Sequence, residues 1–401
     1  MHSTKDNHWP STGSYFAVFS AVGLVTAALG PTLPGLAAQA GVDLDAISLL
    51  FTANSVGYLA GSFVGGRQYD RIAGHRVIAA ALGLMIGGLA LIPLLSSRWL
   101  LVAAWLAVGT AGGALDVGGN TLIVWLHGRG VGPYMNGLHF FFGVGSFIGP
   151  LIAAAALAIA GDATRAYWVL ALLLVPLALW IVRVPSPTAG DDSDDAERML
   201  DGSARRGTQS RDATVVLVAL FLLLYVGAEV AFGGWIYTYA AALGLATATS
   251  AATLTSAFWG ALTVGRLAGI PIAARYRPRT ILLVDLAGCL LSVGLILALP
   301  SSRTALWAGT IALGATMASI FPAAITLAGN RVRITGRITA WFLIGSSIGS
   351  MTVPWLIGQL FEPIGPHVTM WAILATLVAD LAVLVVLLLY SEREQDALVD
   401  W

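Results

Sequence analysis

The strongest constraint in this sequence is a succession of apolar runs, each long enough to cross a lipid bilayer as a helix. A hydrocarbon core of about 30 Å takes about 20 apolar residues of helix to cross, and backbone hydrogen bonds can be satisfied there only by helices or closed barrels. Of the 401 residues, 57% are hydrophobic and 10% are charged, whereas soluble chains carry about 25% charged residues. The sequence therefore predicts an all-α, polytopic membrane protein.

Glycines, prolines and charged clusters divide the apolar sequence into twelve expected transmembrane helices. The first fourteen residues are polar, and the run after them is too long for a cleaved signal segment, so we expect it to be retained. The expected spans are residues 15–37, 46–66, 76–96, 99–126, 133–160, 165–183, 213–242, 250–274, 280–299, 303–328, 334–361 and 368–390.

One long polar stretch, between the sixth and seventh spans, is typical of a flexible linker. We expect an N-terminal six-helix bundle at 1–183, a cytoplasmic linker at 184–212 and a C-terminal six-helix bundle at 213–401. The two halves resemble each other, because VGSFIGP at 144–150 is echoed by IGSSIGS at 344–350. This repetition predicts two pseudo-symmetric bundles.

The basic residues orient the chain, because positively charged loops are retained in the cytoplasm. With a cytoplasmic N-terminus, seventeen of the 21 Lys and Arg residues lie on the cytoplasmic side. Arg98, Arg165 and Arg303 lie outside, and Arg266 lies within a span. We therefore expect both termini to be cytoplasmic and the protein to reside in the plasma (inner) membrane.

The segment GGRQYDRIAGHRV at 65–77 resembles the loop between the second and third helices of the major facilitator superfamily. It has one residue more than the family pattern between the Asp-Arg pair and the next glycine. The resemblance implies the major facilitator fold and a cytoplasmic gate that closes through charge pairs and a helix dipole; the alternative is a basic loop that only fixes topology. The matching residues are Gly66, Asp70, Arg71, Gly74 and Arg76.

A narrower resemblance covers most of the chain and is most specific in the fourth and fifth spans. The runs GGALDVGGNTLIVWL and GPYMNGLHFFFGVGSFIGP resemble the sodium-dependent glucose transporter branch and, more distantly, fucose permeases. The resemblance implies uptake of a sugar or polyol, coupled to sodium or protons. The chain departs from fucose permeases at Gly30, where they have an acid, and at Phe142, where they have an Asn.

Ionisable groups inside a bilayer are costly unless they are paired or face water, so each is a functional candidate. Asp116 and Asn120 are four residues apart and share one helix face, where a carboxylate and an amide are suited to binding sugar hydroxyls or a cation. Glu229, at mid-span in the seventh helix, is a second candidate for binding or ion coupling. For each acid the alternative is a hydrogen bond that holds the bundle together.

Aromatic and histidine side chains near these acids complete the predicted binding set. Tyr225 lies one turn before Glu229, so its ring is suited to packing on a sugar. Trp235 follows on the same helix, where its ring is suited either to extending the pocket or to anchoring the span end at the membrane interface. His139 in the fifth span is a candidate hydrogen-bond partner, with a structural role as the alternative.

Three further intramembrane charges are interpreted as structural. Arg266 and Asp285 lie at similar depths in neighbouring spans, and we expect them to form an ion pair. Asp380 lies in the twelfth span, a helix that is often peripheral in this superfamily, and we assign it no functional role.

The remaining features exclude several other classes of protein. The net charge is zero, which gives no indication of nucleic-acid binding, and the single cysteine, Cys289, excludes disulfides and Cys-based metal sites. No metal, nucleotide or nucleophile motif appears, so we expect no enzyme activity and no cofactor beyond a coupling ion.

We therefore expect a monomeric secondary active transporter that moves a small polar solute, a sugar, by alternating access. One alternative is a proton-coupled efflux antiporter, suggested by Gly145, Gly149 and Pro150, although such antiporters usually carry an Arg in the fourth span that is missing here. A second alternative is a sensor or scaffold that does not transport.

Overall fold

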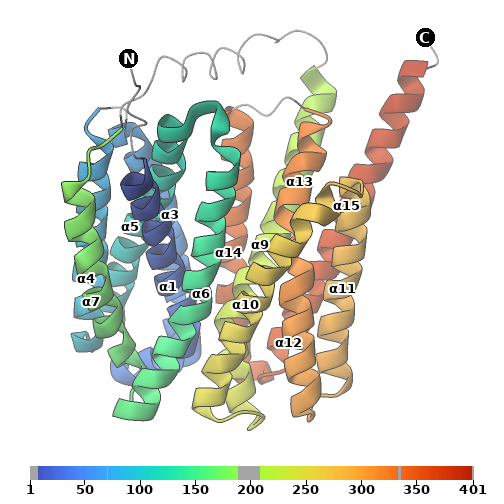
Figure 1. Ribbon diagram of the computed structural model, residues 1–401. Helices are drawn as coiled ribbons and strands as arrows, with labels where there is room; N and C mark the ends of the chain where they lie inside the picture. Colours follow the sequence, from blue (N-terminus) through green and yellow to red (C-terminus); the bar gives the residue numbers. More distant parts are fainter. Residues whose placement is uncertain (1–7, 70, 188–207, 333–335, 400–401) are drawn as a thin grey trace, which may run out of the picture. The chain divides into compact units, whose positions relative to one another are not determined.

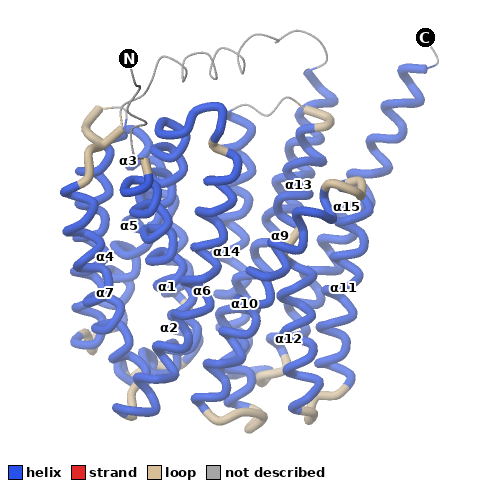
Figure 2. The backbone as a smooth tube through the Cα atoms, viewed as in Figure 1, coloured by secondary structure: helices blue, strands red, loops and turns tan. Residues whose placement is uncertain are grey.

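The computed structural model of the protein describes residues 8–69, 71–187, 208–332 and 336–399. Within these ranges every regular element is a helix, and Figure 2 shows helices joined by short loops. A helix lets an apolar chain satisfy its backbone hydrogen bonds without water. The prediction of an all-α fold is confirmed.

The chain packs into two compact units, one of residues 1–42 with 53–199 and the other of residues 43–52 with 200–401. The long helices are labelled in Figure 1, and the short α2 is labelled in Figure 2. The first unit holds α1 (Trp9–Ala40), most of α3 (Leu49–Tyr69), α4 (Gly74–Leu91), α5 (Arg98–His127), α6 (Gly132–Ala160), α7 (Ala166–Arg183) and the short η1 (Ile92–Leu94), η2 (Gly128–Gly130) and η3 (Ala163–Arg165). The second unit holds α2 (Leu44–Ile47), α9 (Thr208–Ala242), α10 (Ala248–Ala273), α11 (Pro278–Ala298), α12 (Arg303–Met317), α13 (Ile320–Gly329), α14 (Gly336–Ile364) and α15 (Val368–Val399).

Among the described residues, eleven helical stretches are long and apolar enough to cross a bilayer, and each matches an expected span. The remaining expected span, 250–274, is present as the 26-residue α10. Several Ser and Thr residues and Arg266 make this helix less apolar than the others.

Several helices extend beyond their apolar parts. The helix expected to start at residue 213 begins at Thr208, so the end of the expected linker 184–212 is helical. Residues 188–207 of that linker lie outside the described ranges. The last helix continues from residue 390 to Val399. Apolar runs mark the part of a helix that lipid surrounds, and polar residues can continue the same helix into water. The apolar stretches Ala213–Ala242 and Val368–Tyr390 therefore agree with the expected spans, although the helices that contain them are longer.

The repeated glycine motifs bring one pair of helices into backbone contact in each unit. In the first unit, a Cβ on Gly149 of α6 would collide with the carbonyl oxygen of Leu24 on α1. In the second, a Cβ on Gly349 of α14 would collide with the carbonyl oxygen of Leu223 on α9. Small residues at helix interfaces allow such close approach in membranes. The sequence repeat thus corresponds to a structural one.

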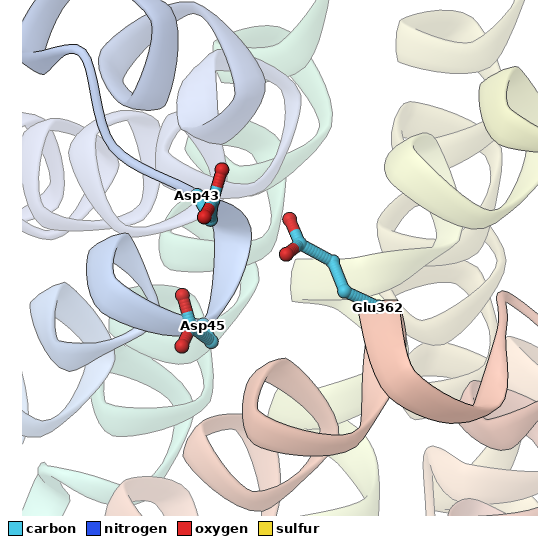
Figure 3. Close-up of side chains that lie close together, drawn as sticks. All are labelled: Asp43, Asp45 and Glu362. Carbon is cyan, nitrogen blue, oxygen red and sulfur yellow. The ribbon is translucent and has the colours of Figure 1, made fainter.

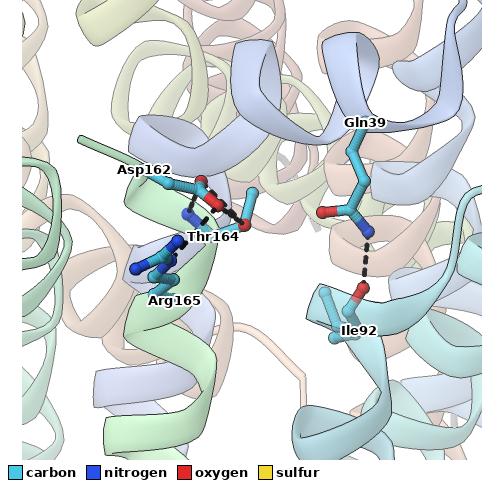
Figure 4. Close-up of polar contacts among 5 residues, drawn as sticks. All are labelled: Gln39, Ile92, Asp162, Thr164 and Arg165. Carbon is cyan, nitrogen blue, oxygen red and sulfur yellow. Dashed lines mark hydrogen bonds and ion pairs between the residues drawn. The ribbon is translucent and has the colours of Figure 1, made fainter. Parts of the chain in front are cut away.

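Loop ends of the first unit are fixed by polar contacts. Gln39, near the end of α1, donates from Nε2 to the carbonyl oxygen of Ile92 at 2.7 Å (Figure 4). It also donates to the carbonyl oxygen of Leu95 at 2.7 Å. The Asp162 carboxylate accepts from the Thr164 backbone N–H at 2.8 Å and caps η3. These side chains satisfy backbone groups that the helix ends leave unpaired.

Candidate functional site

The clearest polar cluster of the first unit joins α3 and α5. Tyr58 donates from its hydroxyl to Oδ2 of Asp116 at 2.7 Å, and Asn120 donates from Nδ2 to the backbone oxygen of Asp116 at 2.9 Å. A Cβ on Gly113 would collide with the backbone oxygen of Tyr58, so this glycine allows α3 to approach α5 closely. The structure thus adds a tyrosine to the predicted pair of Asp116 and Asn120.

This cluster keeps unused hydrogen-bonding capacity. Asp116, Asn120 and Tyr58 are all half-buried. Among the described residues, none donates a hydrogen bond to Oδ1 of Asp116 or to the amide oxygen of Asn120. Because an ionised carboxylate accepts through both oxygens, the cluster can still accept hydrogen bonds from ligand hydroxyls.

The second unit holds its predicted acid in an ion pair. The Glu229 carboxylate on α9 lies 3.9 Å from Nη2 of Arg266 on α10, and both side chains are largely buried. The expected pair of Arg266 with Asp285 is wrong, because within the described part of the chain Asp285 Oδ2 is buried without a hydrogen-bond partner. The two residues lie at similar depth, but depth alone does not determine which helix faces meet.

Tyr225 connects this ion pair to a break in the neighbouring helix. It lies one turn before Glu229 on α9, and its hydroxyl donates to the Met317 carbonyl oxygen at 2.8 Å. The helix is interrupted after Met317, between α12 and α13. Pro322 explains the interruption, since its ring clashes with the carbonyl group four residues earlier. Tyr225 and Glu229 thus lie together, as the sequence predicted.

The two remaining predicted binding residues differ in environment. Trp235 is fully buried, donates from Nε1 to the Pro354 carbonyl oxygen at 2.9 Å and stacks on Phe361. These contacts use its polar group and one ring face for packing. His139 is exposed and meets the Phe19 ring edge-on, with ring centroids 5.8 Å apart. Their binding roles stay predictions.

The predicted cytoplasmic gate is only partly described. Asp70, its central acid, lies outside the described residues. Gly66 lies near the end of α3, and Gly74 begins α4, where a Cβ would press on the Leu122 side chain. Arg71 and Arg76 are exposed. Charge pairing in this loop therefore stays a prediction.

A buried histidine that the sequence analysis missed lies next to this loop. The His75 ring bonds to the Tyr15 hydroxyl through Nε2 at 2.7 Å and to the Val184 carbonyl oxygen through Nδ1 at 2.8 Å. The end of α3 is held similarly, because Tyr69 donates to the Ala114 carbonyl oxygen at 2.8 Å. Buried tyrosine hydroxyls usually find a partner, so tyrosines within apolar spans were the available signal for these contacts and for Tyr58.

Three carboxylates gather at one end of the second unit (Figure 3). Asp43, Asp45 and Glu362 have oxygens within 4.8 Å of one another, a spacing that suits a cation. Asp43 and Glu362 are exposed. Glu362 accepts from the Leu44 N–H at 3.0 Å, and Gln359 donates to the Asp45 backbone oxygen at 2.9 Å. The cluster therefore attaches the α2 segment to the end of α14.

Comparison with known proteins places these features in a family. The pattern of the Major Facilitator Superfamily matches residues 15–354. The chain belongs to this superfamily. Its members in the comparison are transporters, so the chain is a multi-pass membrane transporter and not an enzyme.

Two relatives show which members of the superfamily this chain resembles in sequence. The chain is 31% identical over 366 residues to sodium-dependent glucose transporter 1 of Xenopus laevis, covering 84% of this chain and 73% of the relative. It is 29% identical to sodium-dependent glucose transporter 1A of Mus musculus, covering 86% and 88%.

Solved structures confirm the superfamily fold. The nucleoside transporter NupG aligns with a TM-score of 0.74 at 12% identity, covering 94% of this chain and 98% of that one. A bacterial homolog of the human lysosomal transporter Spinster aligns with a TM-score of 0.73 at 13% identity, covering 97% and 98%. At these identities the likeness concerns the fold alone.

Proposed function

We propose that this transporter takes up a small polar solute, a sugar, by alternating access coupled to sodium or protons. The observation that carries the proposal is the Tyr58, Asp116 and Asn120 cluster, whose carboxylate and amide retain acceptors for hydroxyl groups. A few placed polar groups in an otherwise apolar site give a ligand its orientation. The named activity of the glucose transporter relatives supports a sugar as the solute.

The glycines that suggested efflux have another explanation. Gly145 and Gly149 pack against the backbone of α1, as Gly345 and Gly349 pack against α9. The motif is thus part of the packing in both units and gives no support to an antiporter. The uptake experiment below distinguishes a transporter from a sensor or scaffold that does not transport.

We further propose a monomer in the plasma (inner) membrane with both termini cytoplasmic. The distribution of basic residues supports this orientation. A cysteine is introduced at each terminus, and its reactivity in intact cells and in inverted vesicles tests this orientation.

The test of the function is uptake of labelled D-glucose and other hexoses into proteoliposomes that contain the purified protein. Sodium and proton gradients are imposed in separate runs. We expect one gradient to drive accumulation of one sugar, and Asp116→Asn to abolish that accumulation because the amide removes the acceptor charge. No uptake of any hexose under either gradient would refute the proposal.

Asp162→Asn is the matched control. It makes the same chemical change at a half-exposed acid that caps η3 at a loop. We expect this variant to accumulate sugar as the unmodified protein does, and full accumulation in Asp116→Asn would remove the assigned role.

A further inference from the structure

Asp380, on α15, is the most deeply buried acid among the described residues. Its side chain is 0% exposed, and neither carboxylate oxygen has a hydrogen-bond partner in the described part of the chain. The residue lies near the middle of the span Val368–Tyr390. Buried polar groups are nearly always hydrogen-bonded, and an isolated carboxylate in hydrocarbon is far more costly than a neutral carboxyl. The structure therefore calls for a reason why an acid is present here.

The helices packed against α15 bring further ionisable groups near Asp380. They are α9, α11 and α14. Cys289 is fully buried at mid-span on α11. Its sulfur is 3.3 Å from the Thr316 hydroxyl. The helix that carries Cys289 and Asp285 thus packs directly against the helix that carries Asp380.

The cations near this group of acids have other partners. Arg266 is paired with Glu229 at 3.9 Å. Arg331 donates from Nη1 to the Leu387 backbone oxygen at 3.0 Å, two turns beyond Asp380 on α15. Among the described residues, no ion pair neutralises Asp380. A bound proton is therefore the available means of neutralising it.

Asp285 supplies a second acid on α11, the helix that packs against α15. It lies one turn before Cys289 on α11, is partly exposed, and has a buried Oδ2 without a described partner. The helix begins at Pro278, directly after the basic segment that contains Arg275 and Arg277. Asp285 therefore lies nearer than Cys289 to the predicted cytoplasmic end of α11, whereas Asp380 lies at mid-span of α15.

We propose that Asp380 is a proton-binding site of the transport cycle, holding its proton in this conformation and exchanging it through Asp285 in another. The inference rests on the proposed cation-coupled uptake and names the proton as the coupling ion. The step is a transfer of one proton from one side of the membrane to the carboxylate and from the carboxyl to the other side. Sodium fits the site poorly, because a hard cation takes several oxygen ligands and no described oxygen bonds to Asp380.

The transport test compares Asp380→Asn with the matched control Thr376→Val, which removes a polar group one turn away on the same helix. Labelled D-glucose is measured in proteoliposomes by gradient-driven accumulation and by counterflow, which needs no coupling. An inward gradient of one pH unit supports about tenfold accumulation by a one-proton symporter. We expect Asp380→Asn to keep counterflow but lose this accumulation, and Thr376→Val to keep both.

Two outcomes would overturn the proton site. One is tenfold accumulation in Asp380→Asn or in Asp380→Leu, which would leave Asp380 with a packing role only. The other is accumulation that follows a sodium gradient and ignores the pH gradient in the unmodified protein.

An infrared measurement tests the site without any sugar. We expect a carbonyl band of a protonated carboxyl in the purified protein at neutral pH, and its loss in Asp380→Asn. If no variant shows glucose counterflow but the band disappears in Asp380→Asn, the sugar proposal fails and the proton-binding site stands. If the band is unchanged in Asp380→Asn, the proton site is refuted whatever the sugar result.

Discussion

The two units are built alike but hold their acids differently. Gly149 of α6 meets α1 as Gly349 of α14 meets α9, backbone against backbone. Asp116 of the first unit, however, is half-buried and hydrogen-bonded to a tyrosine, whereas Glu229 of the second is paired with an arginine. The second unit also holds Asp380, whose carboxylate has no hydrogen-bond partner among the described residues. The comparison indicates that the two units share a pattern of helix packing but differ in the surroundings of their acids. The acid of the first unit can accept hydrogen bonds from hydroxyl groups, whereas Glu229 of the second is paired with a cation.

We expect the largest loss of stability from adding a methyl group where the two glycine-containing helices, α14 and α6, contact the backbones of α9 and α1. Gly349→Ala forces α14 away from the Leu223 carbonyl of α9, and Gly149→Ala does the same to α6 and α1. We expect each variant to lose at least about 3 kcal/mol of stability, the upper end for overpacking, measured as thermal unfolding in detergent.

Gly294→Ala on α11 is the control, because its new methyl group meets open space. We expect it to be neutral or slightly stabilising, since alanine favours the helix by about 0.5–1 kcal/mol. Equal stability of the Gly294 and Gly349 variants would mean that the glycine contacts do not hold these helix pairs together.

The ion pair of the second unit is tested by substituting Arg266. Arg266→Gln leaves Glu229 without its cation, and we expect a loss of about 2 kcal/mol, below the roughly 3–5 kcal/mol of a fully buried pair because Arg266 is 27% exposed. Thermal unfolding measures the loss. The double variant Glu229→Gln/Arg266→Gln should recover much of it, and a double variant less stable than Arg266→Gln would show that the pair is not the cause.

The smallest expected effect concerns the hydrogen bond that orients Asp116. Tyr58→Phe removes the donor to Oδ2, and we expect the KM for sugar uptake to rise about tenfold, which is about 1.4 kcal/mol, with kcat little changed. Tyr69→Phe deletes the same group from a tyrosine whose hydroxyl donates to a backbone oxygen of α5, the helix that carries Asp116. A KM that rises equally in both variants would assign the effect to loss of packing.

The sequence predicted the helices well because the requirement for about 20 apolar residues per span is severe. It also placed Asp116 beside Asn120 and Tyr225 beside Glu229, since residues one turn apart share a helix face. These successes depend on distances along a single helix.

The errors arose where two helices meet. Arg266 contacts Glu229 and not Asp285, because helix rotation decides the partner and apolar runs leave rotation undetermined. The contact of Tyr58 with Asp116 depends on the close approach at Gly113. The ring that stacks on Trp235 belongs to Phe361, more than a hundred residues away, so the sequence did not indicate this contact, and the binding role of Trp235 stays a prediction.

Because residues 43–52 pack with the second unit, expressing the two halves of the chain as separate fragments has a structural consequence. These residues precede the second span in the sequence, yet Ser48 lies against Gly358, and Phe51 lies against Gly234 and beside Trp235. A fragment that starts at residue 200 would lack this segment and expose the surfaces that it covers. Two separately expressed halves cut at the linker would therefore have to associate before the second could complete its own packing.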